Sequence, residues 1–377
     1  MHRRIRVLFI VNSLHFGGAE KHVVTLLNHL DVDRFSLSLA YLKDDAALLP
    51  QLDGKRLDGG AFCCHVSTKI DFTAVRKLSE HIRDHGIDIL VCTNTYSLLY
   101  GWVARHLSGH RPKLIEVFHT TELVTTKDKL QMLLYRPLMR ASELLIYVCE
   151  NQRSYWRENG LGAARDAVIH NGIDLAHFSH CYSREEKTVM RARFGLADED
   201  YVVGLCAAMR PEKAHGDLLE AIARLKTIGL RVTGLLIGDG PERQRIEKRI
   251  VALGLVDQVR ITGYMNDVRP AITACDVMSL VSHSETFSIA ALEAMALGKP
   301  MVMTATGGAS EQIRVEEEGF LFAPADIDAL SNCLARLADK CVSETMGARA
   351  RQRVESVFSL ASMVGAYERI FTDMAAS

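Results

Sequence analysis

The feature that most constrains the fold of this chain is a repeated alternation of short apolar runs with stretches of helical periodicity. Each apolar run is continuous, which is typical of strands buried on both faces of a parallel sheet. Regular β–α alternation places helices on both faces of such a sheet. We therefore predict an α/β fold with two doubly wound, Rossmann-like sheets. The runs cover residues 6–11, 37–41, 87–92, 113–118 and 144–148 in the first half, and 201–207, 232–237, 259–262, 276–280 and 301–304 in the second.

The alternation is interrupted once, which indicates two domains. A length of 377 residues exceeds what one ordinary core holds. A turn-rich stretch, 170–178, ends the first series of strands, and a charged segment, 183–193, precedes the second. We place the boundary near residue 180, which gives domains of residues 1–180 and 181–359. An amphipathic helix over about 360–377 is expected to cross back to the first domain.

The composition excludes several classes of protein. Lysine and arginine total 45 against 46 aspartate and glutamate, so the formal charge of −1 argues against a nucleic-acid-binding protein. Nine cysteines indicate reduced thiols rather than a disulfide framework, and the pair Cys63–Cys64 lacks the spacing of a metal knuckle. No window approaches the ~18 apolar residues that span a bilayer, and the first apolar run is too short for a signal peptide. We therefore expect a cytoplasmic protein, or one at the inner face of a membrane.

Two carboxylates interrupt the otherwise apolar segment 282–311. Glu285 precedes a helix of small apolar residues, and Glu293 lies two turns into it. A buried carboxylate needs a partner that offsets the cost of its desolvation. The partner is either a lysine or arginine side chain or a ligand with hydroxyl groups. Because the helix start at residues 287–289 offers backbone N–H groups to a phosphate, a nucleotide sugar would satisfy both features.

Glycines and polar residues follow several predicted strands, at the sheet edge where doubly wound folds bind ligands. Gly17 and Gly18 follow the first strand, and they either admit a ligand close to the backbone or form a plain turn. The three-glycine dinucleotide pattern is absent, so NAD is not indicated. Asn94 and His119 follow two further strands. A histidine at a strand end is as consistent with a structural role as with a functional one.

In the second half, two cationic residues also follow a predicted strand, at the ligand-binding edge of the sheet. Arg210 and Lys213 follow its first strand, where they either neutralise a diphosphate or lie in a solvated loop. Two pairs of aspartates resemble metal ligands, but both lie at helix ends or turns. We interpret them as caps and loop residues and expect no metal. These pairs are Asp31 with Asp33 and Asp326 with Asp328.

The segment 127–140 combines basic residues with leucine, methionine and tyrosine. One interpretation is a helix that rests on a membrane surface or meets a lipid-linked acceptor. The other is a helix whose apolar face packs into the core, with Pro137 marking a break or a new helix start.

Assembled in chain order, these motifs resemble those of the retaining glycosyltransferases of family 4, which have the GT-B fold. The resemblance covers nearly the whole chain, and its most specific part is the pair Glu285 and Glu293 in register with RPEK and NGID. The motifs are GGAE at 17–20, His119, NGID at 171–174, RPEK at 210–213, IGDGPE at 237–242, EAMALGKP at 293–300 and GGASE at 307–311.

The resemblance implies two Rossmann-like domains that face each other across a cleft. The second would bind a UDP- or GDP-linked sugar, and the first would bind the acceptor. Lys213 and Arg210 would hold the diphosphate. Glu293 would bind the ribose, and Glu285 would face the donor sugar. The implied donor-binding set is Gly17, Gly18, Arg210, Lys213, Gly263, Met265, Glu285, Phe287, Ser288, Ile289 and Glu293. The implied catalytic set is His119, Arg210, Lys213 and Glu285, with Asn94 and His119 on the acceptor side.

Two positions depart from the family pattern. Many members have the phosphate-binding arginine where this chain has Ala208, and Arg210 is expected to take its place. Thr286 stands where glycine is frequent, which narrows the approach to the donor sugar.

The expected reaction is transfer of a sugar, with retention, to a hydroxyl group of a glycan or lipid-linked acceptor. By resemblance it would serve the synthesis of cell-surface polysaccharide, lipopolysaccharide or glycolipid. The nucleotide sugar is a substrate, and no metal or other cofactor is expected. Two alternatives stay open: a nucleotide-sugar epimerase or phosphorylase of the same fold, and a non-catalytic sugar-binding protein.

Overall fold

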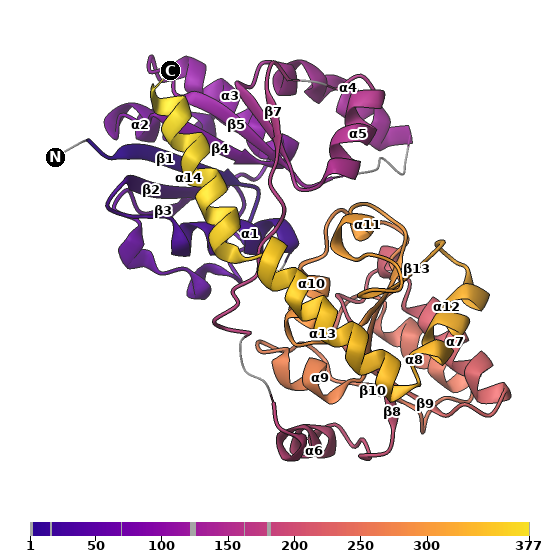
Figure 1. Ribbon diagram of the computed structural model, residues 1–377. Coiled ribbons are helices and arrows are strands. Elements are labelled where there is room, and N and C mark those ends of the chain that lie inside the picture. The colour runs from indigo at the N-terminus through magenta and orange to yellow at the C-terminus, as the bar shows by residue number, and fades with distance from the viewer. Residues whose placement is uncertain are drawn as a thin grey trace. The chain divides into compact units, whose positions relative to one another are not determined.

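The protein consists of two compact units (Figure 1). The computed structural model describes residues 3–15, 17–68, 70–120, 126–161, 163–178 and 182–376. The first unit comprises Met1–Asn171 and Ala361–Ser377, and the second comprises Gly172–Leu360. The boundary expected near residue 180 falls on residues 179–181, which lie outside the described residues.

A parallel sheet of seven strands forms the centre of the first unit, in the order β3-β2-β1-β4-β5-β6-β7. In this sheet Val7 of β1 lies opposite Leu37 of β2 on one side and Ile89 of β4 on the other. The strand order therefore reverses between β1 and β4, which creates a topological switch point at their carboxyl ends. The strands are β1 (Ile5–Val11), β2 (Phe35–Tyr41), β3 (Ala61–Cys63), β4 (Ile89–Thr93), β5 (Lys113–Phe118), β6 (Leu144–Tyr147) and β7 (Asp166–Val168).

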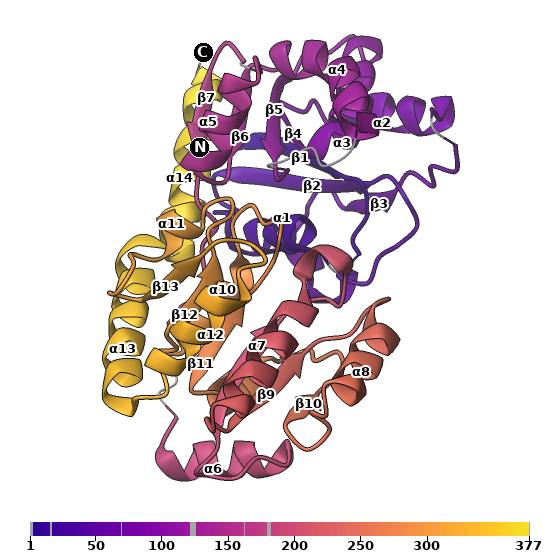
Figure 2. The ribbon, with the colours of Figure 1, turned by 90° about the vertical axis from the view of Figure 1, so that its right-hand side faces the viewer.

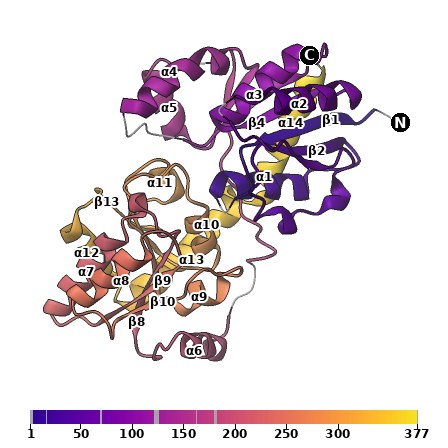
Figure 3. The same ribbon diagram turned by 180° about the vertical axis from the view of Figure 1, so that it is seen from behind.

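Helices pack on both faces of this sheet, and the last helix is one of them (Figure 3). Leu8 of β1 belongs to the same buried cluster as Leu78 and Leu98, which lie on α2 and α3. Phe9 points to the opposite face, where its ring centroid lies 6.2 Å from that of Phe371 on α14. The predicted return of the C-terminal helix to the first unit is confirmed. The helices are α1 (Gly18–His29), α2 (Phe72–Asp84), α3 (Asn94–Leu107), α4 (Thr126–Arg140), α5 (Glu150–Glu158) and α14 (Leu360–Ala376).

The second unit repeats this plan with six parallel strands in the order β10-β9-β8-β11-β12-β13 (Figure 2). Val203 of β8 lies opposite Gly234 of β9 and Val277 of β11, so the switch point lies between β8 and β11. The strands are β8 (Tyr201–Cys206), β9 (Val232–Ile237), β10 (Val259–Ile261), β11 (Val277–Leu280), β12 (Met301–Thr304) and β13 (Gly319–Phe322). The helices are α6 (Arg184–Arg193), η3 (Pro211–Lys213), α7 (His215–Thr227), α8 (Arg243–Ala252), α9 (Arg269–Ala274), α10 (Ile289–Ala296), α11 (Ala309–Gln312), α12 (Ile327–Arg336) and α13 (Lys340–Val357).

Both sheets confirm the predicted pair of doubly wound folds, and β5, β9 and β12 begin and end at the predicted residues. The sequence did not predict β3 and β7, which form the two edges of the first sheet. Each has only three residues and is partly exposed, so neither gives an apolar run long enough to stand out.

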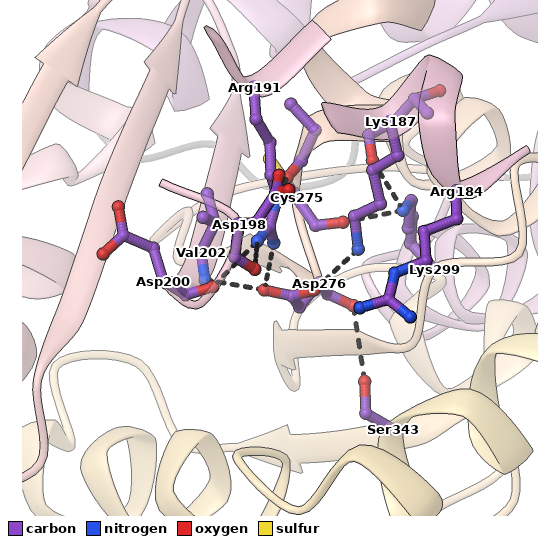
Figure 4. Close-up of polar contacts among 12 residues, drawn as sticks. Arg184, Lys187, Arg191, Asp198, Asp200, Val202, Cys275, Asp276, Lys299 and Ser343 are labelled. Carbon is purple, nitrogen blue, oxygen red and sulfur yellow. Dashed lines mark hydrogen bonds and ion pairs between the residues drawn. The ribbon is translucent and has the colours of Figure 1, made fainter. Parts of the chain in front are cut away.

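A network of charged residues at the amino end of β11 fixes α6 to the second sheet (Figure 4). Lys187 Nζ and Arg191 Nη2 of α6 each lie 2.7 Å from a carboxylate oxygen of Asp276. The same carboxylate accepts a hydrogen bond from Val202 N at 2.8 Å. Lys299 Nζ caps the preceding helix by donating to the carbonyl oxygens at 273 and 275. This network lies at the opposite end of the strands from the switch point, so its role is structural.

The helix α4 covers residues 126–140, and its described side chains are buried on one face and exposed on another. Met132 and Met139 are buried, whereas Leu130, Leu133 and Leu134 are 66%, 57% and 74% exposed. The helix therefore packs into the core, as one interpretation predicted, and also presents a row of leucines. The prediction of a break at residue 137 was wrong, because the proline lies inside the helix. It is three residues from the end, where it removes only one hydrogen bond near a terminus.

In the part of the chain that the structure describes, no helix is both long and apolar enough to cross a membrane.

Candidate active site

Two loops at the carboxyl edge of the second sheet are tied to each other. One follows β8 and includes Lys213, and the other follows β11 and includes Glu285. Lys213 Nζ lies 2.5 Å from Glu285 Oε2. His283 adds two contacts: its N–H donates to Glu212 O at 2.9 Å, and its Nε2 lies 2.7 Å from Asp217 Oδ2. Because β8 and β11 meet at the switch point, a cation and a carboxylate lie where such folds bind ligands.

The backbone next to Lys213 leaves the start of α7 without a side-chain cap. Lys213 ends η3, and Ala214 then adopts a left-handed conformation with φ 47°. The thirteen-residue helix α7 begins at His215, and no side chain caps it. Its first N–H groups and the positive end of its dipole therefore follow Lys213 directly in the chain. A helix start of this kind is suited to an anion.

The GGASE motif supports the loop that holds Glu285. Gly307 has φ 51°, and a Cβ atom there would lie 2.0 Å from Glu285 O. Gly308 N also donates to Thr286 O at 2.7 Å. Only glycine fits at 307, because both the backbone conformation and the close approach exclude a side chain. The side chains of Lys213 and Glu285 are 21% and 19% exposed, so a ligand in solution can reach them.

The helix α10 begins at Ile289, directly after this loop. Ser288 is its cap, with Oγ accepting from Ala291 N at 3.2 Å. Gln312 holds Ser288 in place, because its Oε1 accepts from Ser288 N and its Nε2 donates to Ser288 O. The Ser288 N–H is thus already bonded, and it could contact a phosphate only by leaving Gln312. Glu293 is buried in the second turn of the helix, at 5% exposure.

The loop 237–242 packs against the backbone that leads to Arg210. Met209 N donates to Asp239 O at 2.9 Å, and a Cβ atom on Gly240 would lie 2.6 Å from Met209 O. Arg210 itself is exposed, and among the described residues its guanidinium makes no hydrogen bond or ion pair. The structure therefore brings Lys213 and Glu285 together and leaves Arg210 in solvent.

The remaining residues predicted for the donor lie in turns and at one helix start. Gly263, with φ 73°, follows β10, and its carbonyl oxygen accepts from Gly238 N at 3.1 Å. Met265 is half-buried two residues later. Phe287 is buried, and its ring centroid lies 5.5 Å from that of Phe358, so its side chain belongs to the core.

The first unit has a second group of polar residues at its own switch point. Asn94, the residue directly after β4, has a left-handed backbone with φ 66°, which is uncommon for a residue other than glycine. Its Oδ1 accepts from His119 N at 3.1 Å, which ties the ends of β4 and β5 together. The His119 ring lies edge-on to His22, with centroids 5.2 Å apart. His22 Nε2 lies 3.0 Å from the Tyr367 hydroxyl of α14.

Both histidines of this group are neutral at pH 7. Burial lowers the pKa of His22 to about 4. Burial, together with His22, holds the pKa of His119 well below its usual value. A neutral imidazole donates or accepts a hydrogen bond and does not offer a positive charge. His119 can therefore orient a hydroxyl group, but it cannot neutralise a phosphate.

Gly17 and Gly18 lie at the start of α1 near the end of β1. Gly17 is in extended backbone, with φ −154°, and an added Cβ would meet only the flexible end of the Glu20 side chain. No atom lies within 4 Å of a Cβ built on Gly18. Local packing therefore does not exclude a side chain at either position. Gly17 is the N-cap of α1, a position that favours glycine, and the open space at Gly18 is compatible with the close approach of a ligand.

The structure also shows three polar residues at the second site that the sequence analysis missed. His283 pairs with Asp217, Gln312 fixes Ser288, and His215 is buried at the start of α7. Neither ring nitrogen of His215 has a hydrogen-bond partner among the described residues. Two of them had a signal in the sequence, because His283 lies two residues before Glu285 and His215 lies two residues after Lys213. Gln312 is 24 residues from its partner, so only the fold brings them together.

Comparison with known proteins gives a match to each unit. The model of Glycosyltransferase Family 4 matches residues 16–177, and the model of Glycosyl transferases group 1 matches residues 186–353. Two curated relatives are similar over most of their length. The N-acetyl-alpha-D-glucosaminyl L-malate synthase of Bacillus anthracis is 26% identical over 81% of this chain and 79% of the relative. The UDP-Gal:alpha-D-GlcNAc-diphosphoundecaprenol alpha-1,3-galactosyltransferase of Escherichia coli is 22% identical over 99% of this chain and 98% of the relative.

Solved structures share the same fold. HepE of Anabaena in complex with UDP-glucose has a TM-score of 0.85 and 22% identity, covering 98% of this chain and all of that one. The lipopolysaccharide outer core galactosyltransferase WaaB has a TM-score of 0.73 and 18% identity, and the match covers 98% of this chain and all of that one.

Proposed function

Because this chain belongs to glycosyltransferase family 4 and has the GT-B fold, we propose that it transfers the sugar of a UDP-sugar to an acceptor hydroxyl with retention. The second unit would bind the donor, and the first would bind the acceptor. The observation that supports this most directly is the contact of Lys213 with Glu285 beside the uncapped start of α7.

The proposed step follows from the charges at that edge. As the bond from the sugar C1 to the phosphate oxygen breaks, negative charge builds up on the leaving diphosphate. Lys213 and the start of α7 would stabilise this charge, as fixed donors do for other leaving groups. Glu285, which holds Lys213 before the donor arrives, would then accept a hydrogen bond from a hydroxyl of the donor sugar. Glu293 would bind the ribose, and these residues need no metal to take up the charge.

The polar group of the first unit suits the acceptor. Asn94 and His119 are neutral hydrogen-bonding groups at the end of the sheet, and Gly18, at the start of α1, leaves open space next to its backbone. Such groups orient a hydroxyl at little electrostatic cost. The acceptor hydroxyl would attack C1 from the face that the diphosphate leaves and would pass its proton to the departing phosphate oxygen, which gives retention.

A lipid-linked acceptor and a place at the inner face of a membrane fit one further observation. Leu130, Leu133 and Leu134 form an exposed row on α4, at the helical spacing of a single face. The name of the Escherichia coli relative describes a diphosphoundecaprenol-linked acceptor. We therefore assign α4 to contact with a lipid surface, in the synthesis of a cell-surface polysaccharide, lipopolysaccharide or glycolipid.

The proposal is tested by incubating the purified chain with UDP-sugars and a set of polyprenyl-diphosphate-linked sugars. A thermal-shift screen of UDP, GDP and ADP selects the base first, because a ligand at 100 times its Kd adds about 2.7 kcal/mol of stability. Release of UDP with a longer glycan and an unchanged anomeric configuration would support the proposal. Conversion of the sugar without acceptor would indicate an epimerase instead, and binding without turnover would indicate a sugar-binding protein.

A further inference from the structure

A separate cluster of side chains of the types that can bind a metal ion lies at the edge of the first sheet. Asp44 is in the loop after β2, while Cys63 ends the edge strand β3 and His65 follows it. The carboxylate, the thiol sulfur and a ring nitrogen all lie within 4.8 Å of one another. His65 Nδ1 lies 3.5 Å from Asp44 Oδ2. None of the three belongs to the residues assigned to sugar transfer.

The backbone holds the two segments of this cluster in register. Cys64 N donates to Tyr41 O, and Val66 N donates to Leu42 O, both at 2.8 Å. These bonds continue the pairing of β2 with β3 beyond the ends of the strands. His65 N also donates to Cys63 Sγ at 3.3 Å, and the backbone of His65 is left-handed, with φ 53°. The sulfur and the imidazole are therefore positioned by main-chain contacts.

The three side chains form a donor set typical of zinc. Thiolate, imidazole and carboxylate are its usual ligands, whereas magnesium and calcium prefer oxygen ligands alone. Ligands bonded at 2.0–2.3 Å to a tetrahedral ion lie roughly 3.3–3.8 Å apart. The distance from His65 to Asp44 already falls in this range. Both of these side chains are well exposed, so they can turn toward the sulfur without disturbing the core.

Charge balance also favours a divalent ion. A thiolate and a carboxylate together neutralise a 2+ charge, and the imidazole binds as a neutral ligand. We propose that Asp44, Cys63 and His65 bind a zinc-type transition metal ion, with the fourth position open to water. The ion would link the segment after β2 to the end of β3, and would hold that edge of the sheet in one conformation. Closing a loop in this way reduces the entropy of the unfolded chain.

Cobalt substitution tests this site without reference to catalysis. The full-length protein, reduced and freed of metal, is titrated with Co2+ while the thiolate-to-cobalt absorption band in the near ultraviolet is recorded. We expect a band that saturates at one equivalent and is displaced by Zn2+. In C63S the band should disappear, and in D44A and H65A the affinity should fall at least tenfold. The matched control is C64S, which changes the neighbouring thiol and should keep the band.

Two results would overturn the proposal. One is the absence of a thiolate band in the wild-type protein at one equivalent of Co2+. The other is a band that persists in C63S or disappears in C64S, since either would assign the metal to another cysteine. Circular dichroism of each metal-free variant shows whether it folds. If C63S does not fold, the D44A and H65A titrations decide, and affinity unchanged from wild type in both would reject the site.

Discussion

The two units share one topology but differ in the charge of their polar groups. In the second unit the carboxyl edge holds the ion pair of Lys213 with Glu285 and a hydrogen bond between His283 and Asp217. In the first unit the same edge holds Asn94 with two histidines that burial keeps neutral. The sheet thus fixes where a ligand binds, and the loops decide its chemistry. The charged edge suits a diphosphate, and the neutral edge suits a hydroxyl group.

Buried acids show the same contrast. Asp276 of the second unit is paired with Lys187 and Arg191. Although its burial acts to raise the pKa, these cations and the Val202 N–H hold it below the usual value. Glu116 on β5 of the first unit is fully buried, and neither carboxyl oxygen has a hydrogen-bond partner among the described residues. Burial raises the pKa of Glu116 well above its usual value. One unit neutralises its buried acid by pairing, and the other does so by protonation.

The largest effect on stability is expected from matched amide substitutions of these two acids. Asp276→Asn leaves the buried guanidinium of Arg191 without its counter-charge and should cost about 3 kcal/mol of unfolding free energy. Glu116→Gln replaces a neutral carboxyl with a neutral group of equal size and should cost less than about 1 kcal/mol. Urea unfolding followed by circular dichroism measures both. Equal losses in the two variants would mean that Glu116 is ionised and has a charged partner, and the contrast would be lost.

The next effect concerns activity in the second unit. Lys213→Ala removes the cation proposed to stabilise the leaving diphosphate and should lower kcat at least 100-fold, about 3 kcal/mol in the barrier. Its melting temperature should stay close to that of the wild type, because the lysine is partly exposed. The control is Lys248→Ala, an exposed lysine on α8 of the same unit. A fully active Lys213→Ala enzyme would remove the lysine from the mechanism.

The stability of the first unit should depend on pH. Folded His22 and His81 have pKa values lowered to about 4, mainly by burial, against 6.5 in the unfolded chain. Below pH 6.5 the unfolded chain therefore takes up protons that the folded chain does not. The free energy of unfolding that these histidines contribute is fully present above pH 6.5 and is lost as the pH falls toward 4, by on the order of 3 kcal/mol for a fully buried histidine.

Tryptophan fluorescence isolates this effect, because both tryptophans, Trp102 and Trp156, lie in the first unit. Urea midpoints from this signal should decrease between pH 6.5 and 4, and His22→Gln should reduce the decrease. The exposed His110 provides the control, since His110→Gln should leave the slope unchanged. An identical slope in all three proteins would show that His22 is protonated in the folded state.

The smallest effect is expected on the exposed face of α4. Leu133→Ser and Leu134→Ser should each change stability by no more than about 0.5 kcal/mol, because the side chains contact mainly solvent. Binding to vesicles of anionic phospholipid should weaken about tenfold for each, as expected from the loss of one buried leucine. Val251→Ser, on an exposed face of α8 in the second unit, is the control. If vesicle binding weakened equally in that control, lipid binding would depend on exposed apolar residues in general and not on α4.

Most of the fold could be predicted from the sequence, because central parallel strands are continuous apolar runs. The edge strands β3 and β7 were not predicted, because a strand of three residues is too short to show an apolar run. At the site, the sequence pattern indicated Lys213 and Glu285 and the resemblance added their roles, but their direct contact spans 72 residues and depends on β8 lying next to β11. The neutral state of His119 could not be predicted either, since it follows from burial beside His22.

The return of α14 to the first unit has a consequence for the order of folding. Phe371 of α14 fills space between Phe9 and Phe35, which belong to the first two strands. During synthesis, these strands leave the ribosome more than 300 residues before their partner does. The second unit, whose segments are contiguous, can reach its native state while the first still lacks one side of its core. A nascent chain therefore completes its earlier half last, and shortening the carboxyl end should expose aromatic surface near the amino end.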